Sequence, residues 1–135
     1  MSSITATSKD ARTRLLDAAL KVVRERGYSA TTVDELCKTA GVTKGAFFHH
    51  FKTKDDLGVA AARHWATVTS AMFAAAPYHA PDDPLDRLLA YVDFRKEMLK
   101  GDLPDFTCFV GTTLQETYAT HPDIRVACFD SIAGH

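Results

Sequence analysis

Residues 31–57 constrain the fold of this chain most, because they hold two short helical patterns separated by a glycine. The first pattern places apolar residues at helical spacing on one face: Val33, Leu36, Cys37 and Ala40. Gly41 can adopt the left-handed conformation that ends a helix, and Thr43 can cap a second helix over residues 44–50. Two helices joined by a short glycine-containing turn are typical of the helix-turn-helix unit, whose second helix enters the DNA major groove.

The same stretch, TTVDELCKTAGVTKGAFFHHFKTKDDL, resembles the signature of the TetR family of one-component transcriptional repressors. The matching features are Thr31-Thr32, Ala40-Gly41-Val42, Lys44-Gly45, the aromatic and histidine cluster at 47–51, and the run 52–57. The resemblance covers roughly residues 10–60, and beyond them it is one of architecture only. It implies an all-α fold: an arm over 1–9, a three-helix DNA-binding head over 10–57, and a long fourth helix into a helical ligand-binding and dimerisation domain over 58–135.

The composition favours a cytoplasmic protein that does not enter a membrane. Hydrophobic residues make up 46% of the chain, but no run approaches the roughly 18 apolar residues that a membrane span needs. The N-terminus lacks the features of a secretion signal. The odd set of three cysteines, Cys37, Cys108 and Cys128, indicates reduced thiols rather than a disulfide framework.

Charge is distributed unevenly along the chain. Residues 1–57 carry ten Lys or Arg and seven Asp or Glu, whereas residues 58–135 carry six and ten. This asymmetry indicates a basic end that faces double-stranded DNA and an acidic remainder. The excess on the head is small, so we expect its non-specific DNA binding to be weak and sensitive to salt.

Further helices are predicted around the helix-turn-helix unit, over 10–26, 53–76, 84–100, 104–120 and 123–132. The helix over 53–76 has a predicted inward face, made of Leu57, Ala61, Trp65, Val68, Met72 and Ala75. The helix over 84–100 has a predicted buried stripe, made of Leu85, Leu88, Leu89, Val92 and Leu99. No strand pattern and no repeat appears.

The candidate DNA contacts cluster in the head: Thr31, Thr32, Thr43, Lys44, Gly45, Ala46, Phe48, His49, His50 and Lys54. Lys44 suits a guanine edge, with a phosphate contact as the alternative. Thr43 can cap its helix, contact a phosphate, or do both. Gly45 and Ala46 allow close approach, and the histidines can donate to phosphate. Lys54 lies at a helix start, where phosphates bind favourably.

Phe48 and the two adjacent histidines differ in what they can offer DNA. Phe48 stands where relatives often have Tyr, so it can pack against sugar or a thymine methyl but cannot donate to phosphate. His49 and His50 point in different directions on a helix, so we do not expect them to chelate one metal.

The resemblance also implies a small-molecule pocket in the second domain. Candidate lining residues are Trp65, Met72, Phe73, Tyr91, Phe94, Met98, Phe109 and Gln115. Each lies on a helical stripe, so ordinary core packing is the alternative for most of them. Gln115 is the polar candidate for orienting a ligand. The spacing of His and Cys residues predicts no metal site, and no motif predicts a cofactor or an enzyme.

Two functions remain open from the sequence. The resemblance implies a repressor that binds a palindromic operator as a homodimer and is released by a small-molecule effector. The alternative is a protein-interaction or thiol-redox-sensing module, the latter through Cys108, that does not read DNA specifically. TetR-like proteins usually carry two further long helices that form the dimer interface. This sequence is therefore a fragment, a truncated gene product, or a protein that dimerises differently, and we expect one of the first two.

Overall fold

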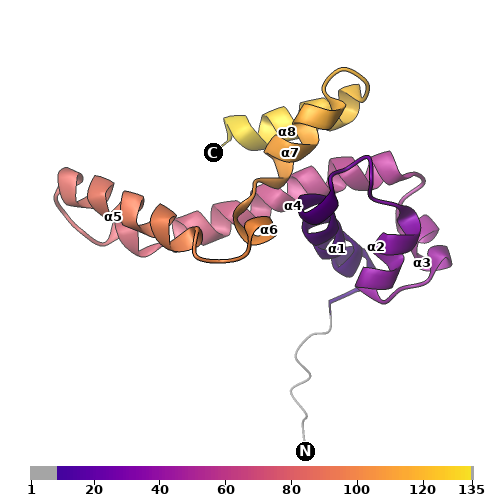
Figure 1. The fold of residues 1–135 in the computed structure, drawn as a ribbon, viewed down its shortest axis with the longest axis horizontal. Helices are drawn as coiled ribbons and strands as arrows, with labels where there is room; N and C mark the ends of the chain where they lie inside the picture. The colour runs from indigo at the N-terminus through magenta and orange to yellow at the C-terminus, as the bar shows by residue number, and fades with distance from the viewer. Residues whose placement is uncertain (1–8, 135) are drawn as a thin grey trace, which may run out of the picture.

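The computed structural model describes residues 9–134, and its regular secondary structure in that range consists of helices (Figure 1). The predicted arm over 1–9 lies outside the described residues except for Lys9. The helices are α1 (Ala11–Arg26), α2 (Val33–Ala40), α3 (Lys44–His50), α4 (Lys54–Ala74), the short 3-10 turn η1 (Pro77–His79), α5 (Pro84–Met98), α6 (Leu103–Phe106), α7 (Phe109–Thr117) and α8 (Pro122–Ala133). The all-α prediction is confirmed. Among the described residues, no helix is both long enough and apolar enough to cross a membrane.

Side-chain caps start the three helices of the head and the long helix α4 that follows them. Thr32 accepts a hydrogen bond from the Glu35 amide at 3.2 Å, and Thr43 accepts one from the Ala46 amide at 3.1 Å. Asp10 caps α1 and Thr53 caps α4 in the same way. Such caps satisfy amides that have no partner within the helix. Gly41 ends α2 with φ +68°, so the predicted left-handed turn is confirmed.

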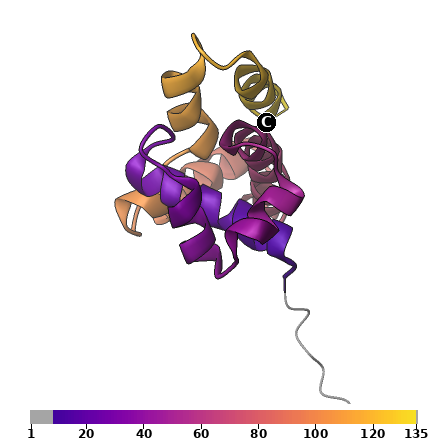
Figure 2. The ribbon, with the colours of Figure 1, turned by 90° about the vertical axis from the view of Figure 1, so that its right-hand side faces the viewer.

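One core joins the head to the last two helices. Leu15 on α1, Phe47 on α3 and Leu57 on α4 are at most 2% exposed, and Phe109 on α7 and Ile124 on α8 are equally buried. All five belong to a single apolar cluster. Helices α7 and α8 therefore pack against α1 and the first half of α4, which Figures 1 and 2 show beside the head. The predicted boundary at residue 57 does not divide the core.

Helix α5 and the second half of α4 extend away from this core (Figure 1). They are called the arm from here on and are distinct from the N-terminal segment 1–9. The predicted inward face of α4 is buried at Leu57 and Ala61, but Val68 and Met72 are 44% and 39% exposed, and Ala75 is exposed as well. The predicted stripe of α5 is not buried either, since its five residues are 48–61% exposed. The expectation for α4 is therefore correct at Leu57 and Ala61 but wrong for its second half, and the expectation for α5 is wrong, because among the described residues these side chains stay about half exposed.

The predicted helix over 104–120 is broken into α6 and α7. Thr107 and Cys108 are extended, with ψ values of 152° and 118°. The Thr107 hydroxyl donates to the Pro104 carbonyl, and the Arg24 guanidinium on α1 donates to the Asp105 carbonyl at 3.2 Å. These bonds take up carbonyls that a continuous helix would use. The break lets α7 turn back onto α1.

Candidate nucleic-acid interface

Helix α3 buries one face and exposes the other. Phe47 is fully buried, and its ring lies 5.7 Å from that of Phe51, which is also buried. The opposite face presents Thr43, Lys44, Gly45, Phe48, His49 and His50 to solvent, with Ala46 half-buried beside them. The head therefore holds a short polar helix on an apolar anchor and leaves its outer face free to enter a groove.

The start of α3 is open to close approach. Only the Thr43 hydroxyl comes within 4 Å of where a side chain on Gly45 would begin, at 3.8 Å. Thr43 accepts the Ala46 amide, but its own O–H remains available to donate. The cap and a phosphate contact are thus compatible. Thr32 has the same arrangement at the start of α2.

Lys44 is held by an ion pair between the two helices of the unit. Its ammonium lies 2.8 Å from the carboxylate of Asp34 on α2, and both side chains are more than 60% exposed. The hydrogen bond and the charge of Asp34 raise the pKa of Lys44. Exposed ion pairs contribute little stability, so Lys44 can exchange Asp34 for another acceptor at low cost.

Phe48, His49 and His50 are the exposed aromatic and histidine residues of α3. Phe48 is 53% exposed, and its ring meets Phe47 edge-on at 5.1 Å. The rings of His49 and His50 lie 5.0 Å apart, nearer than their divergent helical directions suggested. No group of three or more His, Cys, Asp or Glu in residues 9–134 is arranged to hold a metal ion.

Two predicted DNA contacts face inward instead. Thr31 is 2% exposed, and its hydroxyl donates to the Gly27 carbonyl at 2.7 Å. The Lys54 ammonium donates to the carbonyls of Tyr28 and Thr31 and lies 4.3 Å from the centre of the Tyr28 ring. This corrects the expectation that both side chains are free to bind phosphate. The turn between α1 and α2 folds over the start of α4, and its carbonyls accept hydrogen bonds from both side chains.

Sequence reasoning missed Tyr28, which is the centre of that turn. Its ring is 4% exposed, and its hydroxyl donates to the Asp55 carboxylate on α4. Burial, and then this hydrogen bond, raise the pKa of the Tyr28 phenol. His121, just before α8, lies edge-on to the Tyr28 ring at 5.9 Å, and its Nε2 is 3.5 Å from Asp55. An aromatic residue just after a helix-ending glycine was the one available sequence signal.

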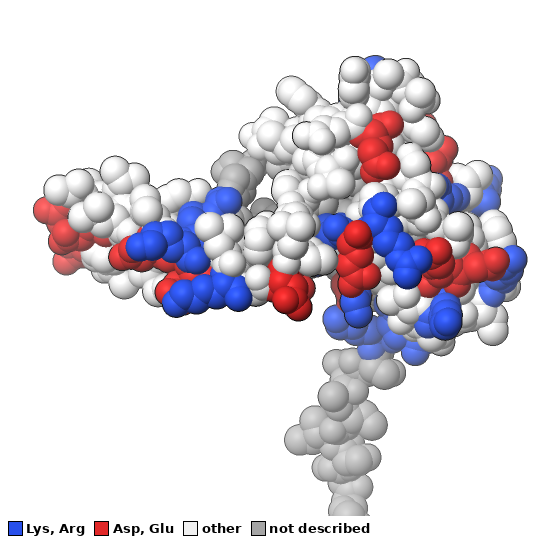
Figure 3. All heavy atoms as spheres, viewed as in Figure 1, with Lys and Arg blue, Asp and Glu red and all other residues white. Residues whose placement is uncertain are grey.

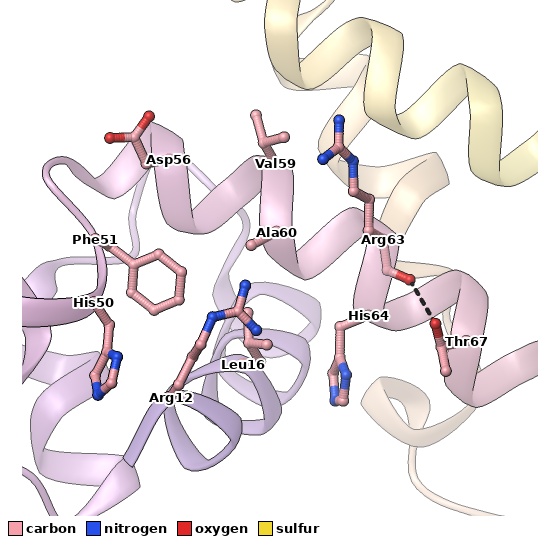
Figure 4. Close-up of a pocket in the computed structure, with 10 residues that line it drawn as sticks. All are labelled: Arg12, Leu16, His50, Phe51, Asp56, Val59, Ala60, Arg63, His64 and Thr67. Carbon is pink, nitrogen blue, oxygen red and sulfur yellow. Dashed lines mark hydrogen bonds between the residues drawn. The ribbon is translucent and has the colours of Figure 1, made fainter. Parts of the chain in front are cut away.

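A polar cleft of about 430 Å³ lies between α1, α4 and the end of α3 (Figure 4). The Arg12 guanidinium lies 5.5 Å from the centre of the Phe51 ring at its wall. His64 and Lys9 both bond to Asp17 nearby; burial tends to raise the pKa of Asp17, but these two hydrogen bonds outweigh it and lower that pKa. Asp56 also lines the cleft. Carboxylates accompany the cations here, so the cleft is not a strongly basic site.

The predicted ligand-binding residues are not gathered in one cavity, which corrects that expectation. Trp65 and Phe109 pack together in the core with ring centres 6.3 Å apart, whereas Met72 and Gln115 are exposed and Met98 is half-buried. Phe73, Tyr91 and Phe94 lie in the arm. A cavity of about 560 Å³ is present there, lined by Ser70, Phe73, Ala74, Tyr78, His79, Tyr91 and Gly134.

Charged residues of both signs lie on the head and on the arm, but they gather in different places. On the face drawn in Figure 3, Lys and Arg gather along the lower edge of the head, whereas Asp and Glu lie at the tip of the arm, with Lys and Arg further along it. Basic residues near α3 complement the charge of a nucleic-acid backbone.

Comparison with known proteins agrees with this geometry. Residues 15–61 match the family of bacterial regulatory proteins described as the tetR family. The chain is 34% identical over 113 residues to the transcriptional regulator AcuR of Cereibacter sphaeroides, which covers 84% of this chain and 52% of AcuR. This chain therefore spans about half the length of AcuR.

Solved structures share the fold. The regulatory protein TetR from Rhodobacter sphaeroides matches with a TM-score of 0.75 and 31% identity, over 92% of this chain and 66% of that one. The reduced form of Escherichia coli NemR matches with a TM-score of 0.71 and 29% identity, over 93% of this chain and 64% of that one. The helix-turn-helix geometry, the match over residues 15–61 and these relatives agree, and the chain belongs to the tetR family of bacterial regulatory proteins.

Proposed function

We propose that this protein is a transcriptional repressor that binds double-stranded DNA through α3. The observation that carries the proposal is the outer face of α3, where Lys44, Phe48 and His49 are exposed around an open Gly45 while Phe47 anchors the helix in the core. A helix held in this way fits the major groove. The head that presents it lies within the residues that match the tetR family.

Each exposed residue has a role that its chemistry supports. Lys44 reaches guanine O6 and N7, Gly45 and Ala46 allow the backbone to approach, and Thr43 donates to a phosphate. Thr32, His49 and His50 donate to phosphates around the helix. Two such heads in a homodimer read the two halves of a palindrome. A regulator that acts on chromosomal DNA works in the cytoplasm, does no catalysis of its own and needs no cofactor, and we propose the same here.

Selection of binding sites from random duplexes tests the proposal. We expect an enriched sequence whose complex weakens steeply between low and physiological salt, because phosphate contacts release counterions. Binding that shows no sequence preference, or no binding at low salt, contradicts it. The Lys44→Ala variant is the matched control, since it should alter base preference while leaving the fold intact.

We propose that the effector binds in the arm, in the cavity of about 560 Å³ beside Phe73 and Tyr91. Three aromatic rings line it, those of Phe73, Tyr78 and Tyr91. The rings of Tyr78 and Tyr91 are 5.2 Å apart, and the Phe73 ring lies 5.8 Å from that of Phe94, which does not itself line the cavity. Small-molecule sites of this size combine apolar walls with polar groups, and this cavity places Ser70 and His79 beside its aromatic rings. Helix α4 joins this cavity to the head. A ligand that binds better when α4 is displaced would therefore lower the fraction of molecules whose heads are placed to bind DNA.

Thermal-shift screening of aromatic compounds tests the cavity. A compound that raises the melting temperature of the wild type should lose that effect in the Tyr91→Ala variant, and it should weaken operator binding. The Leu88→Ala variant is the control, because Leu88 is exposed on the same helix and does not line the cavity. A hit that stabilises both variants equally places the site elsewhere.

Thiol-redox sensing is the second candidate function. Cys108 is exposed, whereas Cys37 and Cys128 are buried, and burial raises the pKa of Cys128 to about 11. One of the similar structures is a reduced form of NemR. Alkylation of the folded protein near pH 8 should therefore modify Cys108 alone. Redox sensing is supported if mild oxidation of Cys108 changes operator binding and the Cys108→Ser variant does not respond.

A further inference from the structure

Glu116, near the end of α7, binds the turn that leads from α1 into α2. Its carboxylate accepts the Tyr28 amide at 2.5 Å and the Ser29 amide at 3.2 Å, across 88 and 87 residues of sequence. These two amides come directly after α1 ends at Gly27, beyond the reach of its helical hydrogen bonds. An acceptor that carries a charge binds backbone amides more strongly than a neutral one does.

The fit between Glu116 and the turn is close. Gly27 has φ +88°, and a Cβ added to it would lie 3.1 Å from a Glu116 carboxylate oxygen. The backbone thus approaches the carboxylate where a side chain would crowd it. Glycine meets both requirements at this position, because it tolerates positive φ and leaves room for close approach.

The turn that Glu116 binds is rigidly connected to the reading head. The Tyr28 carbonyl accepts from Lys54, its hydroxyl donates to Asp55, and Thr32 at the end of the turn caps α2. Arg14 on α1 donates to the Gly41 carbonyl at 3.0 Å, in the turn just before α3. A displacement of the Tyr28 turn would therefore move the starts of both α2 and α4.

The other side of the contact is equally fixed. Thr113 and Thr117 of α7 are fully buried, and Ile124 of α8 packs where a Cβ on Gly58 would lie 3.1 Å from it. Glu116 itself remains exposed to water. Its bonds should therefore contribute little to overall stability, while they set where the head lies against α7 and α8.

We propose that Glu116 is a positioning residue for DNA binding: it holds the α1–α2 turn so that the head is oriented for its operator. This inference rests on the proposed DNA-binding function. A movement of α7 that withdraws the carboxylate would release the turn and weaken binding. Coupling of this kind is reciprocal, so DNA binding should in turn strengthen the Glu116 contact.

The test compares four forms of the chain: wild type, Glu116→Ala, Glu116→Gln and Leu114→Ala. Leu114 is partly buried on the same helix and packs against the core, so its variant loses stability without touching the turn. Amide hydrogen exchange at Tyr28 and Ser29 reports the contact itself. Operator affinity, measured at a temperature where every variant is folded, reports positioning.

In Glu116→Ala we expect exchange of the two amides to accelerate at least about tenfold, and operator affinity to fall about tenfold, within the range typical of coupled sites. Glu116→Gln keeps the length of the side chain and one acceptor oxygen. It should therefore restore part of the amide protection and part of the operator affinity. Leu114→Ala should be less stable yet bind DNA within about twofold of wild type.

The outcomes separate the two proposals. Wild type that binds no duplex overturns the proposed function and the positioning role with it. Wild type that binds its operator, with Glu116→Ala binding equally well, overturns the positioning role alone. A loss of affinity in Leu114→Ala as large as that in Glu116→Ala does the same, because the effect would then follow stability rather than the contact.

Discussion

The head and the arm have similar helical patterns and different degrees of burial. In the head, Leu15, Phe47 and Leu57 are at most 2% exposed. In the arm, Leu85, Leu88 and Leu89 are 55–61% exposed, although they too recur at helical spacing. The head is covered by α7 and α8, whereas α5 packs mainly against η1 and the end of α4. An apolar stripe thus predicts a helix, and burial depends on what packs against it.

The comparison also separates two kinds of exposed residue. The exposed face of α3 surrounds an anchored ring and carries groups that can bond to DNA. The exposed face of α5 is a row of leucines, a surface that favours contact with other apolar groups. Exposure in the head is therefore expected to matter for binding, and the following predictions test that contrast.

Phe47→Ala should have the largest effect. The ring is fully buried, so its loss should lower the free energy of unfolding by about 3–5 kcal/mol. Leu88→Ala in the arm should change it by about 0.5 kcal/mol or less, because Leu88 is 58% exposed. Urea denaturation measures both. Equal losses would mean that the arm is covered in solution and that the contrast is false.

Lys44→Ala should have the next largest effect, and the effect should be on DNA binding rather than on stability. We expect it to cost about 1–3 kcal/mol of discrimination at one base position. Lys96→Ala in the arm is the control, since Lys96 is similarly exposed and also pairs with a carboxylate, that of Asp93. Competition titrations with operator variants measure the difference. An unchanged base preference would assign Lys44 to a phosphate instead.

Phe48→Tyr should have a smaller and favourable effect. The ring is 53% exposed, so a hydroxyl can be added without disturbing the core. If it donates to a phosphate, operator binding should tighten by up to ~1.5 kcal/mol, with the fold unchanged by circular dichroism. Unchanged or weaker binding would show that the ring faces away from the DNA backbone.

Gly58→Ala should have the smallest effect of the four. A Cβ there would lie 3.0 Å from the Tyr28 ring, which Asp55 holds in place. Strain of about 1–3 kcal/mol, less up to about 1 kcal/mol gained in helix propensity, leaves a net loss near 1 kcal/mol. Gly45→Ala meets no such contact. It should not lower stability, but it should weaken DNA binding by crowding the approach of α3, and thermal denaturation with operator titration checks both.

Much of the head was predictable because its signals are local. The caps at Thr32, Thr43 and Thr53 bond to amides three residues ahead, and Gly41 ends α2 by its own conformation. The helix starts, the tight turn and the exposed Lys44 follow from these short-range rules. The inward positions of Thr31 and Lys54 did not, because their partners lie in a turn whose path the local pattern leaves open.

The sequence by itself determined that the chain is helical, where most of its helices begin, and that its head is a helix-turn-helix unit of the tetR family. Only the tertiary structure decided the break between α6 and α7, the exposure of α5, and the meeting of Glu116 with Tyr28. The physical reason is the distance along the chain between the residues that interact. Hydrogen bonds within a few residues are fixed by local spacing, whereas burial and contacts across 88 residues depend on how the whole chain packs.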